Sequence, residues 1–140
     1  MNMKNRIHFR LLLALLLLMP GCTPTEKKET SENKIVTLAP DDFKSTLASK
    51  PDAVLVDVRT PDEFSEGIIE GAINIDFKDP SFGEKINALD KSKPYFVYCL
   101  SGKRSGDAAI QMDSVGFKSI YLLKGGYKEW KNAGLATARP

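Results

Sequence analysis

A short apolar segment that leads into a cysteine-containing loop constrains the fold of this chain more than any other feature. Residues Tyr95–Tyr98 are aromatic or β-branched and follow the breaker Pro94, which is typical of a buried strand. Cys99 comes directly after them, and the next five residues contain a glycine and two cations. From Ser105 onward, apolar residues recur at helical spacing, at Ala108, Ala109, Met112 and Val115. The sequence therefore predicts a strand, a loop and a helix, with the thiol where open α/β sheets bind ligands.

This position predicts an ionised, nucleophilic thiol at Cys99. Loop amides that converge on one point, together with the amino end of a helix, form a cradle for an anion and favour thiolate over thiol. Lys103 and Arg104 add positive charge, so we expect the pKa of Cys99 to lie below the free value of about 8.5. The alternative is a buried, inert cysteine that packs as a small apolar residue. The glycine, the two cations and the helix start favour the reactive thiol.

Strand-like and helix-like segments alternate along the rest of the domain. Apolar and β-branched runs predict strands at residues 35–38, 53–58, 72–75, 95–98 and 119–123. Helices are expected from Pro40, from Thr60, over 82–89, from Ser105 to Gly116 and around Trp130. The alternation predicts an α/β fold with a central parallel sheet of about five strands and helices on both faces. Trp130 is expected in the core, because a large aromatic residue on a terminal amphipathic helix is usually buried.

Three motifs resemble those of the rhodanese-like domains. The loop from Cys99 through Gly102 to the helix start resembles the active-site loop of that family. The segments 56–64 and 67–75 are similar to its amino-terminal signature, and 125–135 is similar to its carboxy-terminal one. These motifs occur in the family's order and cover the chain from about residue 35 to about residue 137. Gly125 and Gly126 in the last motif are expected to let the backbone approach the Cys99 loop.

The resemblance implies sulfur transfer through a persulfide on Cys99. The thiolate would take a sulfane sulfur from an anionic donor such as thiosulfate and pass it to a thiol or to cyanide. No cofactor and no metal are implied. The candidate substrate-binding residues are Leu100, Ser101, Gly102, Lys103, Arg104 and Arg59. For Asp57 and Arg59 a structural ion pair is the alternative, and for Arg59 the sequence leaves the choice open.

Other activities of the same fold class remain to be weighed. Phosphatases on this fold use a cysteine loop one residue longer, whereas Arg104 lies five residues after Cys99, as in the shorter loop. Arsenate reduction stays open if an external thiol resolves the intermediate. A non-catalytic binding or redox-sensing module is the alternative of a different class, although inactive members generally lack the loop cysteine. One departure from the family is Ile68, which stands where a histidine is usual.

The first 21 residues are predicted to be a secretory signal peptide. Three basic residues precede a pure apolar run, Leu11–Leu18, and Gly21 and Cys22 follow it. The run is too short to span a bilayer as a helix of the mature protein. The ending resembles a bacterial lipoprotein cleavage box, so Cys22 is predicted to be lipidated. An ordinary signal peptide with an incidental Cys22 is the alternative.

Cleavage would leave a short tether and one domain. Residues 22–34 are polar and charged and are predicted to be a flexible tether, followed by the domain at 35–140. The protein would then be exported and anchored by lipid to the bacterial cell envelope. Three of the 20 basic residues and none of the 18 acidic ones lie in the signal, which leaves 17 against 18. This balance gives no argument for nucleic-acid binding.

The cysteine and histidine content limits the chemistry further. The chain has two cysteines, and if Cys22 carries lipid, Cys99 has no partner for an internal disulfide cycle. Their spacing does not match Cys-x-x-Cys, so a zinc site is not expected. The only histidine, His8, lies in the predicted signal peptide. A Cys–His or Ser–His pair is therefore not expected, and Cys99 must be activated by charge and by backbone dipoles.

Overall fold

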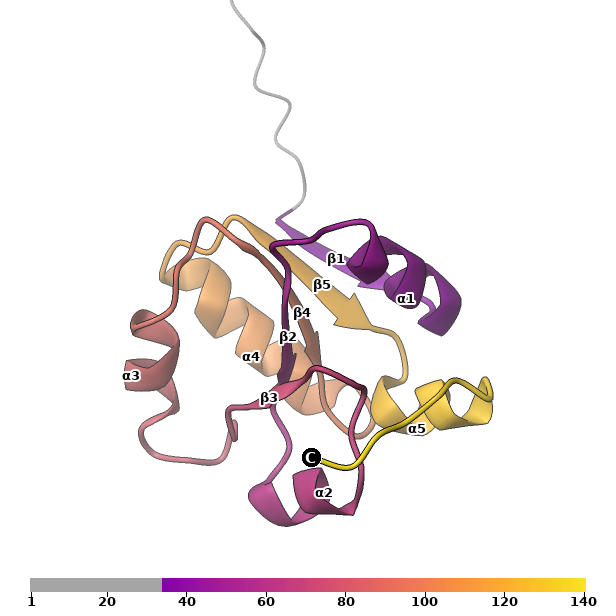
Figure 1. The fold of residues 1–140 in the computed structure, drawn as a ribbon. Coiled ribbons are helices and arrows are strands. Elements are labelled where there is room, and N and C mark those ends of the chain that lie inside the picture. The colour runs from indigo at the N-terminus through magenta and orange to yellow at the C-terminus, as the bar shows by residue number, and fades with distance from the viewer. Residues whose placement is uncertain (1–33) are drawn as a thin grey trace, which may run out of the picture. The chain divides into compact units, whose positions relative to one another are not determined.

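The computed structural model describes residues 34–140, in which strands and helices alternate (Figure 1). The strands are β1 (Ile35–Leu38), β2 (Val54–Asp57), β3 (Ile73–Asn74), β4 (Pro94–Tyr98) and β5 (Ser119–Leu123). The helices are α1 (Pro40–Ala48), α2 (Pro61–Glu66), α3 (Phe82–Asn87), α4 (Lys103–Ser114) and α5 (Gly126–Asn132). All strand pairings in this sheet are parallel. The predicted α/β fold, with a five-stranded parallel sheet between helices, is confirmed.

The order of the strands creates a point where the chain changes direction across the sheet. The order is β1-β5-β4-β2-β3, so the chain leaves β2 toward one edge and leaves β4 toward the other. Because parallel crossovers are right-handed, this reversal puts the following helices, α2 and α4, on opposite faces of the sheet. Figure 1 shows α3 and α4 on one side of the sheet and α1 and α5 on the other. The carboxyl ends of β2 and β4 therefore form a topological switch point, where ligands bind in open α/β folds.

Strand β4 lies at the centre of the sheet and is buried on both faces. Side chains alternate along a strand, so Tyr95 and Val97 pack toward α3 and α4, whereas Phe96 and Tyr98 pack toward α1 and α5. All four are at most 1% exposed. The same alternation places Cys99 in the cluster on the α3/α4 face. The unbroken apolar run identified in the sequence thus fixes the face on which the thiol lies.

An aromatic cluster fills the space between the sheet and the helices α1 and α5. The ring of Phe43 on α1 meets Phe96 edge to face, with centroids 5.1 Å apart, and lies 6.3 Å from the ring of Trp130. Trp130 is 4% exposed, and its Nε1–H donates to the carbonyl of Ala136 at 2.9 Å. The prediction that Trp130 belongs to the core is confirmed.

Helix α4 begins two residues earlier than its apolar spacing indicates. The pattern starts at Ser105, but the helix starts at Lys103, and Gly102 precedes it with φ of 102°. The first two helical residues, Lys103 and Arg104, are charged, so they carry no apolar periodicity for the sequence to show. The consequence is a shorter loop, which brings the amino end of α4 close to Cys99.

The predictions for the first part of the chain lie outside the described residues. They concern the signal peptide at 1–21, the lipidated Cys22 and the tether at 22–34, of which only residue 34 is described. Across residues 34–140, none of the helices combines the length and the apolar character that crossing a bilayer requires.

Replacing Phe43 by alanine should destabilise the domain strongly. Its side chain is fully buried between β4 and α5, so its removal leaves a cavity in the aromatic cluster. We expect a loss of about 3–5 kcal/mol in the free energy of unfolding, measured by urea denaturation. Ile110→Ala is the control, because Ile110 on α4 is 65% exposed and its truncation should change stability little. Equal effects of the two substitutions would contradict the described packing.

Candidate active site

The loop between β4 and α4 wraps its backbone around the sulfur of Cys99. The amide of Gly102 donates a hydrogen bond to Sγ at 3.1 Å. The hydroxyl of Ser105 lies 3.5 Å from the same sulfur and 3.1 Å from the carbonyl oxygen of Gly102. It has one proton, so it can donate either to this carbonyl or to an ionised sulfur. The left-handed conformation of Gly102 allows this tight return of the chain, because a residue with a Cβ would be strained there. The sulfur thus faces one amide and one hydroxyl at the amino end of α4.

The hydrogen bonds to Cys99 outweigh the effect of its burial. Cys99 is 1% exposed and packs among apolar residues of the α3/α4 face, and this burial raises the pKa of the thiol. Hydrogen bonds from the side chain and amide of Ser105 and from the amides of Gly102 and Ser101 lower it. The net pKa lies below that of an ordinary cysteine. The predicted decrease in the pKa of Cys99 is therefore confirmed, and it occurs although the thiol is buried.

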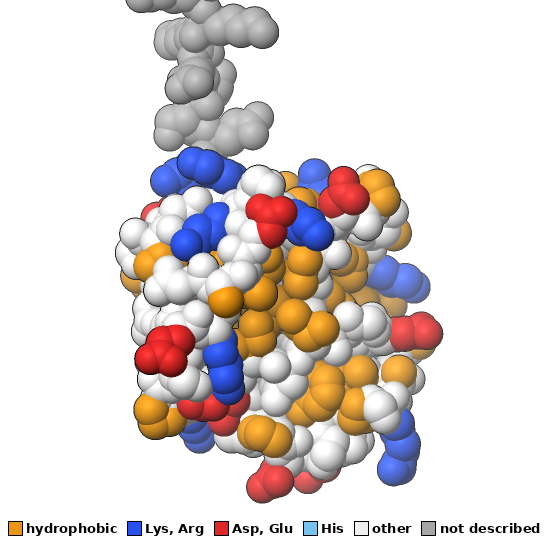
Figure 2. Space-filling model, turned by 60° about the vertical axis from the view of Figure 1, so that its left-hand side comes forward, with side chains coloured by type: hydrophobic (Ala, Val, Ile, Leu, Met, Phe, Trp, Pro, Cys, Tyr) orange, Lys and Arg blue, Asp and Glu red, His pale blue; other side chains and the backbone are white. Residues whose placement is uncertain are grey.

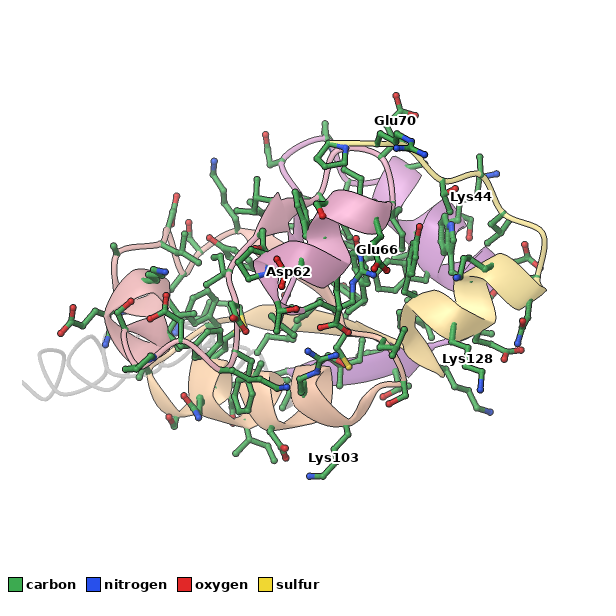
Figure 3. All side chains as sticks on the ribbon, turned by 90° about the horizontal axis from the view of Figure 1, so that it is seen from below. Lys44, Asp62, Glu66, Glu70, Lys103 and Lys128 are labelled. Carbon is green, nitrogen blue, oxygen red and sulfur yellow. The ribbon has the colours of Figure 1, made fainter. Side chains whose placement is uncertain are left out.

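The expected source of this shift, the two loop cations, is wrong for Lys103. Its side chain is 85% exposed, and its Nζ lies 3.2 Å from Oδ2 of Asp107, one turn along α4. Figure 3, viewed from below Figure 1, shows Lys103 pointing away from the body of the domain. The first turn of the helix directs this side chain to solvent, so the ammonium group is not part of the cradle around Cys99.

Arg104 is held by a carboxylate from another helix. Its Nη1 and Nη2 donate to Oε2 and Oε1 of Glu63 on α2, at 2.7 and 2.8 Å. The Glu63 hydrogen bonds raise the pKa of Arg104, and the negative charge of an ionised Cys99 adds to this effect. Arg104 therefore remains under the electrostatic influence of the sulfur, but its guanidinium already has an anionic partner. The pair links α2 to α4 across the switch point between β2 and β4.

Glu63 also completes the amino terminus of its own helix. Its carboxylate accepts from the amide and the hydroxyl of Thr60, each at 3.0 Å, while the Thr60 hydroxyl accepts from the Glu63 amide. The side-chain hydrogen bond with Arg104, followed by the bonds with Thr60, lowers the pKa of Glu63 to about 2 in spite of partial burial. Glu63 is therefore ionised at neutral pH and fixes Arg104.

The structure gives Arg59 structural contacts in place of the expected substrate contact. Its guanidinium is nearly fully buried and forms a bidentate pair with Asp57, with Nη2 2.6 Å from Oδ2. The same Nη2 donates to the carbonyl of Gly67 at 2.7 Å, and the ring of Tyr127 lies 4.2 Å from the guanidinium carbon. The interpretation of Asp57 and Arg59 as an ion pair that ties neighbouring loops agrees with these contacts. Arg59 instead links β2, the segment after α2, and α5.

The remaining loop residues contribute mainly their backbone. Leu100 is 41% exposed, which is unusual for a leucine, and the side chain of Ser101 is also exposed. Their side chains are free to meet a molecule that approaches the loop, while the carbonyl of Leu100 accepts a hydrogen bond from the amide of Lys128 on α5. Among residues 34–140, His, Cys, Asp and Glu side chains form no group of three or more suited to hold a metal ion.

Sequence reasoning missed two side chains at this site, Ser105 and Glu63. Ser105 is fully buried, and a serine in the first turn of the helix after a cysteine loop was the available signal. Glu63 was recognisable as the last member of a Thr-x-x-Glu capping box. That pattern predicts a helix start, but the partner, 41 residues away in the sequence, required the fold.

Comparison with known proteins gives the family. The family model described as "Rhodanese-like domain" matches residues 39–133. The chain is 39% identical to the Bacillus subtilis protein YqhL, described as uncharacterized, over 67% of this chain and 71% of that protein. It is 38% identical to the thiosulfate sulfurtransferase GlpE of Coxiella burnetii, over 61% of this chain and 78% of the relative. It is also 32% identical to the thiosulfate:glutathione sulfurtransferase of Saccharomyces cerevisiae, over 79% and 88%.

Solved structures show the same architecture. The crystal structure of a rhodanese-related protein from Thermoplasma volcanium superposes with a TM-score of 0.65 at 27% sequence identity. The match covers 74% of this chain and 97% of the other. The family model matches a region of 95 residues, and the structure has the five-stranded parallel sheet with the cysteine loop at its carboxyl edge. The chain belongs to the rhodanese-like domain family.

Proposed function

We propose that the protein is a sulfurtransferase that carries a sulfane sulfur on Cys99. The main support is the hydrogen bond of 3.1 Å from the Gly102 amide to Sγ, in a loop that lowers the pKa of the thiol. Thiolate is the nucleophilic form of cysteine, and a carrier of sulfur must be a nucleophile at neutral pH. The naming of two relatives as thiosulfate sulfurtransferases supports this reaction class.

In the first proposed step the Cys99 thiolate attacks the outer sulfur of thiosulfate. A sulfur–sulfur bond forms to Cys99 while the bond between the two thiosulfate sulfurs breaks, and sulfite leaves with the electron pair. The product is a persulfide anion on Cys99, so charge balances without transfer of a proton. The amides of the loop from Leu100 to Arg104 would bind this outer sulfur, since backbone donors stabilise an anion where it develops.

In the second proposed step a nucleophilic acceptor removes the outer sulfur. Cyanide or an ionised thiol attacks it, the bond to Sγ breaks, and the electron pair returns to Cys99 as thiolate. Thiocyanate or a persulfide of the acceptor is released. The relative from Saccharomyces cerevisiae is named for transfer to glutathione, which supports a small thiol as one acceptor class.

The competing functions can be separated by offering the protein thiosulfate with cyanide and, separately, an aryl phosphate. A phosphatase would release phosphate from an aryl phosphate through the same cysteine. A binding or redox-sensing module would turn over neither compound. The presence of Cys99 in a loop of the shorter length favours sulfur transfer over both.

Replacing Cys99 by serine should abolish thiocyanate formation from thiosulfate and cyanide. The serine hydroxyl does not ionise near neutral pH, so no persulfide can form on it. Colorimetric detection of thiocyanate measures the rate. Mass spectrometry of the wild type after thiosulfate should show a gain of about 32 Da, one sulfur atom, on Cys99. Thiocyanate formation at equal rates by both proteins, or aryl phosphate hydrolysis without thiocyanate, would contradict the proposal.

The alkylation rate of Cys99 should depend on pH with a midpoint below that of an ordinary cysteine. The folded protein favours thiolate, so thiolate persists to lower pH than in a free thiol. Ser105→Ala removes a hydrogen bond to the sulfur and should raise the midpoint by about one pH unit. This midpoint is measured from the rate of reaction with iodoacetamide over about five pH units that include the free thiol pKa, from about pH 5 to about pH 10.

Ser114→Ala is a matched control for Ser105→Ala. Both serines lie on α4 and donate to the carbonyl three residues earlier, Gly102 and Gln111 respectively. Ser114 is exposed at the far end of the helix, so its replacement should leave the midpoint of Cys99 unchanged. A midpoint that stays the same in Ser105→Ala would show that the hydroxyl does not stabilise the thiolate.

We also propose that the protein is exported and anchored to the cell envelope by lipid on Cys22. The basic and apolar start of the chain, with a small residue directly before Cys22, supports this localisation. The polar stretch at 23–33 would then separate the membrane from the domain.

Cys22→Ser should release the protein from the membrane fraction. Without the thiol no lipid can be attached. Metabolic labelling with a fatty-acid analogue should therefore be lost, and the protein should no longer sediment with the membranes. Cys99→Ser is the control, because it changes the other cysteine and should keep both the label and the membrane fraction. Equal labelling of wild type and Cys22→Ser would contradict lipidation at this position.

A further inference from the structure

The first turn of α5 binds the backbone of the cysteine loop from the side opposite the sulfur. The amide of Tyr127 donates to the carbonyl of Cys99 at 2.8 Å, and the amide of Lys128 donates to the carbonyl of Leu100 at 3.0 Å. The first amides of a helix have no partner within the helix. In α5, two of them are therefore used to hold two consecutive carbonyl groups of the loop.

This anchoring determines where the next amides of the loop point. In a trans peptide the C=O of one residue and the N–H of the following residue point in opposite directions. Residues 34–140 contain no cis peptide bond. Because the carbonyls of Cys99 and Leu100 face α5, the amides of Leu100 and Ser101 must face away from it. The Ser101 amide is among the donors that lower the pKa of Cys99. The Gly102 amide then follows with its hydrogen bond to Sγ.

Gly126 makes the close approach of α5 to the loop possible. A Cβ on Gly126 would lie 2.5 Å from the carbonyl oxygen of Cys99 and 2.6 Å from the carbonyl carbon and oxygen of Leu100. These are backbone atoms, so no side-chain rotation can relieve the overlap. Gly125 differs, because the three atoms nearest to a Cβ there all belong to the side chain of Glu129.

We propose that Gly126 is a positioning residue for the reaction of Cys99. Its lack of a side chain lets α5 hold the carbonyls of Cys99 and Leu100, which turns the following amides toward the sulfur. The residue does not touch the substrate and acts only through the loop. The inference rests on the proposed function in one respect, that the ionised sulfur of Cys99 is the reacting atom.

The test compares Gly126→Ala with Gly134→Ala in the full-length protein. Both glycines have left-handed backbone conformations, with φ of 64° and 70°, so alanine brings similar backbone strain. At Gly134, however, a Cβ would have no atom within 4 Å. We expect the iodoacetamide midpoint of Cys99 to rise by about one pH unit in Gly126→Ala, a roughly tenfold loss of thiolate below the midpoint. Gly134→Ala should keep the wild-type midpoint.

Two outcomes would overturn the inference. One is a folded Gly126→Ala protein with the wild-type midpoint, and the other is an equal shift in both variants. If circular dichroism shows that Gly126→Ala does not fold, an amide-to-ester replacement at residue 128 decides, with the α-hydroxy analogue of lysine in place of Lys128. It removes only the N–H that binds the Leu100 carbonyl and leaves the side chain in place. We expect a smaller upward shift in that variant, and an unchanged midpoint would refute the positioning role.

The midpoint measurement separates this inference from the proposed function. Alkylation reports the ionisation of Cys99 and requires no sulfur donor or acceptor. If the wild type forms no thiocyanate, sulfur transfer fails as a function, while the comparison of Gly126→Ala with Gly134→Ala still decides the role of Gly126. If thiocyanate forms but the midpoints do not differ, only the inference about Gly126 fails.

Discussion

The hydrogen bond between the Gly102 amide and the sulfur of Cys99 is the interaction on which the rest of the site depends. Burial alone would keep the thiol protonated and inert, because a charge loses its hydration in an apolar environment. Cys99 lies in such an environment, in the cluster between the sheet and α4. What reverses the balance is a set of short-range donors from the loop and from Ser105. The sulfur is therefore buried from solvent and still faces hydrogen-bond donors. Hydrogen bonds to an anion are strongest under this condition, because the local dielectric constant is low.

The charged side chains around the site mainly hold its elements together, although Arg104 also interacts electrostatically with the ionised sulfur of Cys99. Arg104 is bonded to Glu63, and Arg59 is bonded to Asp57 and to the carbonyl of Gly67. The Arg104–Glu63 pair joins α4 to α2, and the bond from Arg59 to Gly67 joins the end of β2 to the segment after α2. Figure 2 shows one face of the domain, on which acidic and basic side chains are interspersed among apolar ones. A mixed face of this kind gives weak long-range attraction, so in the proposed function short-range contacts in the loop would select the sulfur donor.

The sequence was sufficient to predict the fold because most strands coincide with short, largely apolar runs that end at breakers. The central strand β4 shows this best, since Tyr95–Tyr98 are all buried on one face or the other. The position of Cys99 at the end of β4 followed from the same pattern. The partners of the charged residues could not be predicted, because Glu63 and Arg104 are 41 residues apart and meet only through the order of the strands. The direction of a lysine side chain such as Lys103 depends on where its helix begins, which periodicity leaves uncertain by a few residues.

A cradle built from main-chain amides makes its chemistry depend on packing more than on the identity of the loop side chains. Leu100 can change its side chain without removing an amide, and it is the exposed apolar residue nearest the thiol in the chain. By contrast, the orientation of its peptide group is set by α5, which is itself held to the sheet by Tyr127 and Trp130 in the aromatic cluster. Substitutions in that cluster would therefore change the ionisation of Cys99 by moving α5, although they lie on the opposite face of the sheet from Cys99. Under the proposed function, the exposed loop side chains would select the donor or acceptor, whereas the buried backbone contacts would control the ionisation of the thiol.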